Sequence, residues 1–312
     1  MKKLCTLIAS FLIASFLIAH ASFGQSTEEH LASFNTKTDV VYKTIDGKKL
    51  TLILFLPDKP SEEKMPVMIY THGGGWAGGN PYSIFKSSFK GTLRGMLDKG
   101  IACAAITYRL TKNGITAADS VQDCKDAARF IMENAESLKL DPQRMGVFGG
   151  SAGGHLSLMT GLSKNELFLG DQKLSQHDPQ FKCIVSYYPL TSFLRSDLLK
   201  ESNFETPAKL AKIIGESPSK NPKIASLLSP STHLKKDSPP VLLIHGKKDK
   251  VIPISQSELL MEVGQKEDSN IRLISVKGAG HSFKGKKISP SIEAINQSAL
   301  DFITSHLKPA TR

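Results

Sequence analysis

Six short, predominantly apolar segments are separated by stretches with helical periodicity. The segments cover residues 67–70, 101–107, 145–148, 183–187, 241–244 and 271–276. As a group they lack the alternation of apolar and polar residues that marks a strand with one solvated face, so each is predicted to be a strand covered on both faces. Strands of this kind alternating with helices predict a three-layer α/β fold, with a mostly parallel central sheet and helices on both faces.

The helical and hairpin patterns complete this fold prediction. In residues 117–138 the apolar positions recur at spacings of three and four, which predicts one amphipathic helix, and residues 152–162 follow a second helical pattern. Near the start, residues 40–45 and 49–56 alternate around the turn dipeptide Asp46-Gly47. This pattern predicts an N-terminal antiparallel hairpin.

The domain organisation is simple after a short leader. Residues 25–312 are predicted to form one α/β domain, because no linker or boundary appears between residues 27 and 308 and a chain of 312 residues suits one large domain. Residues 190–240 are rich in Ser, Pro and Lys, with short helical pieces around 207–214. This stretch is expected to be an insertion that forms a partial cap over the C-terminal edge of the sheet.

Residues 1–24 have the pattern of a secretory signal peptide. Lys2 and Lys3 precede an uncharged run over residues 4–19, and small residues follow, so cleavage is expected after Ala21 or Gly24. The alternative is an uncleaved membrane anchor, but the run is shorter than the about 20 residues that span a bilayer. The sequence therefore predicts a secreted or periplasmic protein without a stable membrane anchor.

The charge balance is strongly basic but dispersed. The formal net charge is +11, and removing Lys2 and Lys3 with the acid-free leader leaves +9. The lysines occur in scattered pairs rather than in a basic block, so a nucleic-acid partner is not expected. A solvated lysine surface is the simplest interpretation, and an acidic polymer is a second one.

The cysteine pattern predicts neither a disulfide nor a metal site. Outside the leader, which contains Cys5, the cysteines are Cys103, Cys124 and Cys183, each in an apolar setting. Buried free thiols are therefore expected, and no paired Cys or His spacing predicts a bound metal.

A strand, a sharp glycine-flanked turn and a helix surround Ser151. The run Gly149-Gly150-Ser151-Ala152-Gly153 comes directly after the predicted strand 145–148 and opens the helical pattern 152–162. G-x-S-x-G in this context is the nucleophile elbow, in which the serine occupies a strained conformation and larger flanking residues would collide with neighbouring elements. Ser151 is therefore a candidate nucleophile.

A second glycine-rich run, His72-Gly73-Gly74-Gly75-Trp76, follows the predicted strand 67–70. Consecutive glycines allow backbone N–H groups to point into a cleft, where such donors stabilise an oxyanion. The run alone is equally compatible with a flexible turn. Together with a separate G-x-S-x-G motif, it is the combination found in lipases and esterases.

The candidate base and its carboxylate partner come later in the chain. Of the nine histidines, His281 lies in a loop just after the last predicted strand, where α/β sheets place reactive groups. Asp249 follows the strand 241–244 and precedes His281. This order, serine then aspartate then histidine, predicts a catalytic triad of Ser151, Asp249 and His281.

These motifs resemble those of the α/β-hydrolase superfamily, specifically its hormone-sensitive-lipase-like and feruloyl- or acetyl-esterase-like carboxylesterases. The resemblance extends over residues 40–307 approximately. It implies the α/β-hydrolase fold, Ser151 as nucleophile, an oxyanion hole formed by the N–H groups of Gly74, Gly75 and Ala152, and no cofactor. Many hormone-sensitive-lipase-like members have Asp immediately before the serine, whereas this chain has Gly150, as do secreted esterases that act on polysaccharide esters.

The expected function is that of a secreted serine carboxylesterase. Its predicted substrates are small-molecule or polysaccharide esters with short acyl chains, including acetyl or feruloyl groups on plant polysaccharides. Trp76 and Phe283 adjoin the reacting groups and either bind substrate in the acyl pocket or pack behind it. Two alternatives are a serine peptidase of the prolyl-oligopeptidase type, which usually carries a propeller domain, and a non-catalytic binding protein, which usually lacks a triad member.

Overall fold

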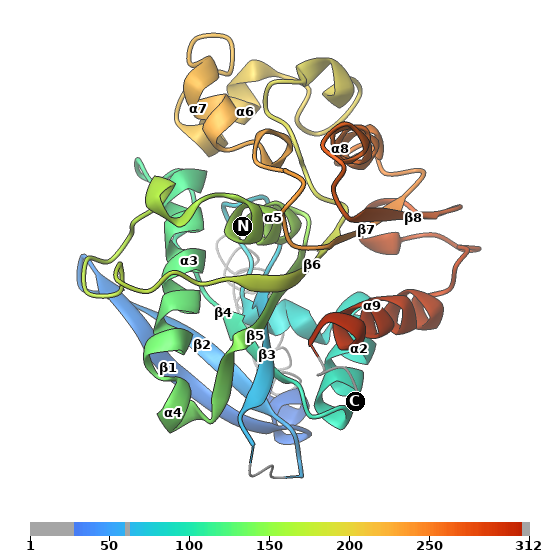
Figure 1. Ribbon diagram of the computed structural model, residues 1–312. Helices are drawn as coiled ribbons and strands as arrows, with labels where there is room; N and C mark the ends of the chain where they lie inside the picture. Colours follow the sequence, from blue (N-terminus) through green and yellow to red (C-terminus); the bar gives the residue numbers. More distant parts are fainter. Residues whose placement is uncertain (1–27, 60–62, 308–312) are drawn as a thin grey trace, which may run out of the picture.

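A twisted sheet forms the centre of the molecule (Figure 1). The computed structural model describes residues 28–59 and 63–307, and within them the sheet has eight strands in the order β1-β2-β4-β3-β5-β6-β7-β8. The strands are β1 (Asn35–Ile45), β2 (Lys48–Leu56), β3 (Met65–Thr71), β4 (Ala102–Ile106), β5 (Leu140–Gly150), β6 (Phe181–Tyr187), β7 (Val241–Gly246) and β8 (Ile271–Val276). β3 to β8 pair in parallel, and β1 and β2 are antiparallel, so the predicted sheet and hairpin are confirmed.

The hairpin between β1 and β2 turns at the predicted dipeptide. Asp46 and Gly47 both have positive φ, 49° and 72°, as a tight hairpin turn requires. The pairing register shifts between Lys37 and Val40, where Asp39 has φ of 54°. β2 then pairs antiparallel with β4, so the hairpin extends one edge of the parallel sheet.

Helices cover both faces of the sheet. They are α2 (Ser87–Asp98), α3 (Ala117–Glu133), α4 (Ala135–Leu138), α5 (Ala152–Leu162), α6 (Pro207–Ile214), α7 (Pro222–Leu227), α8 (Ser255–Lys266) and α9 (Ile292–Leu307), with short 3₁₀ turns η1 (Pro81–Phe85), η2 (Asn165–Leu167), η3 (Ser196–Leu199), η4 (Pro230–Thr232) and η5 (His281–Phe283). α3, α5 and α8 pack on one face, and α2 and α9 pack together on the other (Figure 1).

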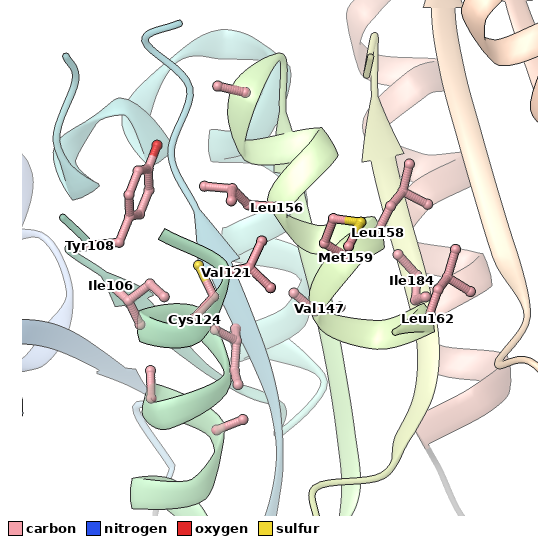
Figure 2. Packing of buried hydrophobic residues seen from close by; sticks show 14 of the residues in the cluster. Ile106, Tyr108, Val121, Cys124, Val147, Leu156, Leu158, Met159, Leu162 and Ile184 are labelled. Carbon is pink, nitrogen blue, oxygen red and sulfur yellow. The ribbon is translucent and has the colours of Figure 1, made fainter. Parts of the chain in front are cut away.

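The alternation of side chains along β3 divides the core into two clusters. Val67 and Ile69 point toward the α3 and α5 side, whereas Met68 and Tyr70 point toward α2 and α9. Figure 2 shows the first cluster, in which Val121 of α3 and Leu156 of α5 meet side chains of the strands. Burial of each such aliphatic side chain contributes about 1.5–3 kcal/mol, so both faces help to hold the helices in place.

The helix predicted over residues 117–138 is divided at Asn134. α3 begins at a capping box, in which the Thr116 N–H donates to the Asp119 carboxylate at 2.8 Å. It ends at Asn134, whose side-chain amide donates to the Phe130 carbonyl at 2.9 Å, and α4 follows. α4 begins directly after Asn134, so the apolar residues keep their helical spacing across the break. Periodicity alone could therefore not show where α3 ends.

The segment between β6 and β7 contains η3, α6, α7 and η4. In Figure 1 it occupies the top of the molecule, in yellow and orange, beyond the C-terminal ends of the central strands. Leu210 and Ile213 of α6 belong to the same buried cluster as Trp76, which joins this segment to the main core.

The predicted leader, residues 1–24, lies outside the described residues. Within the two described ranges, none of the helices combines the length and the apolar character needed to cross a lipid bilayer.

Candidate active site

Ser151 lies at the sharp turn between β5 and α5. Its backbone has φ of 60° and ψ of −123°, an unfavourable conformation for a residue with a side chain. The turn is held by a hydrogen bond from the Ser151 N–H to the Tyr187 carbonyl at 2.9 Å, and the His155 N–H donates to the Ser151 carbonyl at 3.0 Å. The hydroxyl is therefore presented at the end of the sheet on a fixed backbone.

The glycines of the turn are required by the close approach of other atoms. A Cβ at Gly149 or Gly153 would lie 2.3 Å or 2.0 Å from the Thr71 carbonyl oxygen, so the obstacle on both sides of the serine is the end of β3. At Gly150 a Cβ would lie 2.7 Å from the Phe89 ring. Any residue larger than glycine before Ser151, including an acidic one, would therefore require the Phe89 and Tyr188 rings to move.

The structure brings the three predicted triad residues together. The Ser151 hydroxyl donates to His281 Nε2 at 3.0 Å, and His281 Nδ1 donates to Asp249 Oδ2 at 2.7 Å. These residues follow the C-terminal ends of β5, β8 and β7. Parallel strands place these ends at one edge of the sheet, so residues separated by up to 130 positions converge.

Asp249 is held as a carboxylate. Its Oδ1 accepts hydrogen bonds from the N–H groups of Val251 at 2.8 Å and Ile252 at 3.0 Å. Burial opposes the charge, but interactions with His245 and His281, together with the Ile252 N–H, outweigh burial and hold the pKa of the Asp249 carboxyl well below its usual range. A negative charge is therefore fixed beside the imidazole of His281.

His245 is a neighbour of the triad that the sequence analysis missed. It lies at the end of β7, fully buried, with Nε2 at 3.5 Å from Asp249 Oδ2. Nε2 also donates to the Ile252 carbonyl at 2.9 Å, and Nδ1 accepts from the Ser257 hydroxyl at 2.7 Å. The signal available in the sequence was its position four residues before Asp249 at a strand end.

The glycine loop after β3 lies beside Ser151. Gly74 has φ of 131°, and a Cβ there would lie 2.2 Å from the Gly78 carbonyl oxygen, so only glycine fits. Within the part of the chain that the structure describes, the N–H groups of Gly74 and Gly75 have no hydrogen-bond acceptor, and both residues line the cavity that contains Ser151. Ala152 is the first residue of α5, where a helix leaves its N–H unpaired. This is the arrangement that an oxyanion hole requires.

A cavity of about 710 Å³ surrounds Ser151 and His281. Aromatic side chains form much of its wall: Tyr70, Tyr82, Phe85, Phe89, Tyr188 and Phe204. The cavity therefore has room for an acyl group and part of a leaving group, with apolar walls and polar groups both at Ser151 and His281 and around the rim, such as Asn80, Lys86 and Asn203.

Trp76 and Phe283, the two predicted substrate-binding residues, do not line this cavity. Trp76 is fully buried in the core and donates from Nε1 to His155 Nδ1 at 3.1 Å. Phe283 packs edge-on against Tyr188 behind the cavity wall. Of the two interpretations given for these residues, packing behind the pocket is the one observed. Both side chains turn into the core because large aromatic rings are more stable when buried there.

The remaining titratable groups of interest are structural. Burial lowers the pKa of both His72 and His155 to about 4, so both imidazoles are neutral in the fold. The prediction of buried free thiols at Cys103, Cys124 and Cys183 is confirmed. No group of three or more His, Cys, Asp or Glu side chains within residues 28–59 and 63–307 is arranged to hold a metal ion.

Comparison with known proteins agrees with this architecture. The BD-FAE family model matches residues 52–263. Esterase LipC of Mycobacterium tuberculosis is 26% identical over 248 residues, which make up 77% of this chain and 58% of LipC. An acetylxylan esterase of Xylanibacter ruminicola is 25% identical over 212 residues, 67% of this chain and 38% of that protein.

A solved structure shares the fold. A thermophilic esterase from the planctomycete Thermogutta terrifontis has a TM-score of 0.70 and 24% identity, covering 89% of this chain and 95% of the other. The chain spans about half the length of the curated relatives it matches. The family match covers well over half of the chain and includes Ser151, the glycine loop and Asp249, and the fold is that of the α/β-hydrolases. The chain therefore belongs to the BD-FAE family, and the predicted resemblance is confirmed.

Proposed function

We propose that this protein is a serine carboxylic-ester hydrolase. The observation that carries the proposal is the continuous hydrogen-bonded chain from Ser151 Oγ through His281 to Asp249, at 3.0 Å and 2.7 Å, beside a cavity of about 710 Å³. A serine hydroxyl is a weak nucleophile unless a base accepts its proton. The imidazole of His281 is placed to be that base, and the names of the relatives, which are esterases, support the same activity.

The first half of the reaction acylates Ser151. The Ser151 proton passes to His281 Nε2 as Oγ forms a bond to the ester carbonyl carbon. The carbonyl oxygen becomes an oxyanion, which the N–H groups of Gly74, Gly75 and Ala152 would stabilise. The carbon–oxygen bond to the alcohol then breaks, and the alcohol leaves with the proton from His281.

The second half restores the enzyme. A water molecule gives a proton to His281 Nε2 and attacks the acyl carbon, forming a second oxyanion in the same place. The bond to Ser151 Oγ breaks, Oγ regains a proton from His281, and the carboxylic acid departs. Asp249 keeps the imidazole oriented and balances its positive charge in both halves.

The substrates that we propose are esters of short acyl chains, including acetyl or feruloyl groups on plant polysaccharides, met after export to the periplasm or the medium. The aromatic wall and size of the cavity support an acyl group that includes an aromatic ring. A relative named acetylxylan esterase supports a polysaccharide substrate. The signal-peptide pattern of residues 1–24 supports export.

Replacement of the nucleophile tests the activity directly. Ser151→Ala is expected to lower kcat for p-nitrophenyl acetate by at least about 10⁴-fold, because no other group can form the acyl-enzyme. Ser175→Ala, which removes the hydroxyl of a half-buried serine that does not line the cavity, is the matched control and should retain wild-type kcat. Circular dichroism would establish that both variants are folded. Turnover by Ser151→Ala comparable to the control would reject the proposal.

A substrate panel separates the proposed activity from its alternatives. Acetylated xylan, acetylated pectin, a feruloylated xylo-oligosaccharide and p-nitrophenyl esters of increasing chain length should be compared, with the acetyl and feruloyl substrates hydrolysed best. A preference for acyl chains longer than eight carbons would count against a polysaccharide substrate. Hydrolysis of an aminoacyl anilide without ester hydrolysis would indicate a peptidase, and a folded protein that a fluorophosphonate does not label would indicate a non-catalytic function.

A further inference from the structure

A second cavity adjoins the one that contains Ser151. Its volume is about 560 Å³, and three residues, Gly75, Asn203 and Phe204, line both cavities. Gly75 also belongs to the glycine loop beside the nucleophile. A long substrate could therefore place its ester group at Ser151, pass Phe204 and occupy the second cavity with another part.

Lysines dominate the charge of this second cavity. Lys112, Lys209 and Lys212 line it, and no Asp or Glu does. The lysines that form ion pairs within residues 28–59 and 63–307 are Lys43, Lys64, Lys164, Lys235, Lys236 and Lys266. The three cavity lysines are not among them, so no described carboxylate pairs directly with their ammonium groups, which give the cavity a positive potential.

None of the acidic residues near this cavity forms a described ion pair with its lysines. Glu205 and Glu216 flank α6 in sequence, but neither lines the cavity. Asp119, near the lining residue Thr116, already pairs with Arg109 Nη1 at 3.0 Å and accepts the Thr116 N–H at the start of α3. The positive groups are therefore available to an anion brought by a ligand.

The uncharged part of the lining fits a sugar. Asn113 and Asn203 are exposed, and among the described residues their side-chain amides have no hydrogen-bond partner, so they can pair with hydroxyl groups. The Phe204 ring is half-buried and packs edge-on against Trp76 at 5.8 Å between ring centroids. A fixed ring of this kind offers an apolar face to the C–H groups of a sugar.

We propose that the second cavity is a subsite for a carboxylate-bearing sugar, a uronate, of the glycan whose ester is cleaved at Ser151. The inference rests on the proposed ester hydrolysis and adds the substrate class to it. The three lysines would pair with the carboxylate, the two amides with hydroxyls, and Phe204 with the ring. A neutral glycan would lose the first of these interactions and keep the others.

Catalysis provides the first test. The variant Lys112→Gln/Lys209→Gln/Lys212→Gln is compared with Lys48→Gln/Lys49→Gln/Lys182→Gln, which removes the same charge from exposed lysines that line neither cavity. The substrates are an acetylated xylo-oligosaccharide with a glucuronate branch, the same compound without the branch, and p-nitrophenyl acetate. For the branched substrate, kcat/KM should fall about 10-fold in the cavity variant only, as expected for three exposed ion pairs.

The other substrates and the ionic strength give further expected results. The unbranched compound and p-nitrophenyl acetate should be hydrolysed equally by all three proteins. Raising the salt concentration from 0.05 M to 0.5 M should remove most of the wild-type preference for the branched compound, because exposed ion pairs are screened. No preference for the branch, or an equal loss in the control variant, would overturn the subsite.

A binding experiment makes the subsite testable even if esters are not cleaved. In the Ser151→Ala background, calorimetry with the de-esterified glucuronate-branched oligosaccharide should detect binding that the three cavity substitutions weaken about 10-fold and the control substitutions do not. Failure of all ester hydrolysis together with this result would reject the proposed function and retain the subsite. Equal binding of the unbranched oligosaccharide, or an equal loss of binding in the control variant, would overturn the subsite.

Discussion

At the scale of single residues, Asp249 shows how the site fixes one charge. Its two oxygens accept hydrogen bonds from the backbone after β7 and from His281, and His245 approaches from the strand itself. Oδ1 has two backbone donors, and Oδ2 has the His281 imidazole as its hydrogen-bond donor with the His245 ring 3.5 Å away. The carboxylate therefore stays in place and ionised when the His281 ring accepts a proton during the reaction.

Asp249→Asn is expected to lower kcat by about 10⁴-fold with little change in the KM of a small ester, because an amide neither holds the reactive imidazole tautomer nor balances the imidazolium charge. Steady-state hydrolysis of p-nitrophenyl acetate measures both parameters. Asp237→Asn, an exposed position before β7, is the control and should be unaffected. A loss below about 10-fold would mean that Asp249 does not act on His281.

The same substitution has a pH signature in stability. The folded-state pKa of Asp249 is depressed below its usual value of about 4, so the ionised carboxylate stabilises the fold above that pH. This contribution is lost as the pH falls through the folded-state pKa. The difference in unfolding free energy between wild type and Asp249→Asn should therefore be full at pH 5–7 and shrink toward pH 3 and below, measured by urea unfolding. A difference that grows on acidification would contradict the assignment.

Single residues could be assigned from the sequence where a motif determines the backbone shape, but not where tertiary packing determines the position of the side chain. Ser151 was predictable because its turn needs glycine on both sides. Asp249 and His281 were predictable because each follows a predicted strand and the three residues occur in the order serine, aspartate, histidine. His245 was passed over because its burial beside Asp249 depends on the loop after β7. For Trp76 the choice between binding substrate and packing behind the pocket stayed open, because sequence shows where a side chain starts and not the direction in which it packs.

At the scale of elements, a buried group of charges fixes α3 against the hairpin. Lys43 of β1 donates from Nζ to Asp123 at 2.9 Å and to Asp126 at 2.6 Å. Arg109 pairs with Asp123 at 2.8 Å, and Arg129 pairs with Asp126 at 2.7 Å. Burial opposes the charge of Lys43, but the two carboxylates outweigh it and raise the pKa of the ammonium.

Lys43→Met is expected to lower the unfolding free energy by about 3 kcal/mol, because it removes one partner of a buried ion network and leaves Asp123 and Asp126 with less compensation. Urea unfolding provides the measurement. Lys48→Met, at the exposed start of β2, is the matched control and should change stability by less than about 0.5 kcal/mol. Equal stabilities of the two variants would show that Arg109 and Arg129 alone neutralise the carboxylates.

Periodicity predicted the elements better than their mutual contacts. The apolar stripe of α3 was visible as spacings of three and four, and the strands were visible as apolar segments. The charged side of α3 carried no such signal, because its partner Lys43 lies 80 residues earlier in the chain. The division at Asn134 was also hidden, since α4 continues the helical phase of α3.

At the scale of the molecule, the order of the strands explains the site. β3, β5, β7 and β8 run parallel, so the glycine loop, Ser151, Asp249 and His281 all emerge at one edge of the sheet. This convergence was predictable because each motif directly follows a strand. The segment between β6 and β7 was not predictable in detail, since its short helices are held by contacts with the core rather than by a repeating pattern of their own.

The thiols of the whole molecule test both the core and the proposed export. Cys103, Cys124 and Cys183 are buried in β4, α3 and β6, and burial raises their pKa, for Cys183 to about 12, so they are protonated and inaccessible in the fold. Ellman's reagent should therefore label none of them rapidly in the native exported protein. After denaturation it should label three thiols per chain if the leader with Cys5 has been removed, and four if it remains. Four thiols in the exported protein would contradict cleavage, whereas rapid labelling of the native protein would contradict the packing of the core.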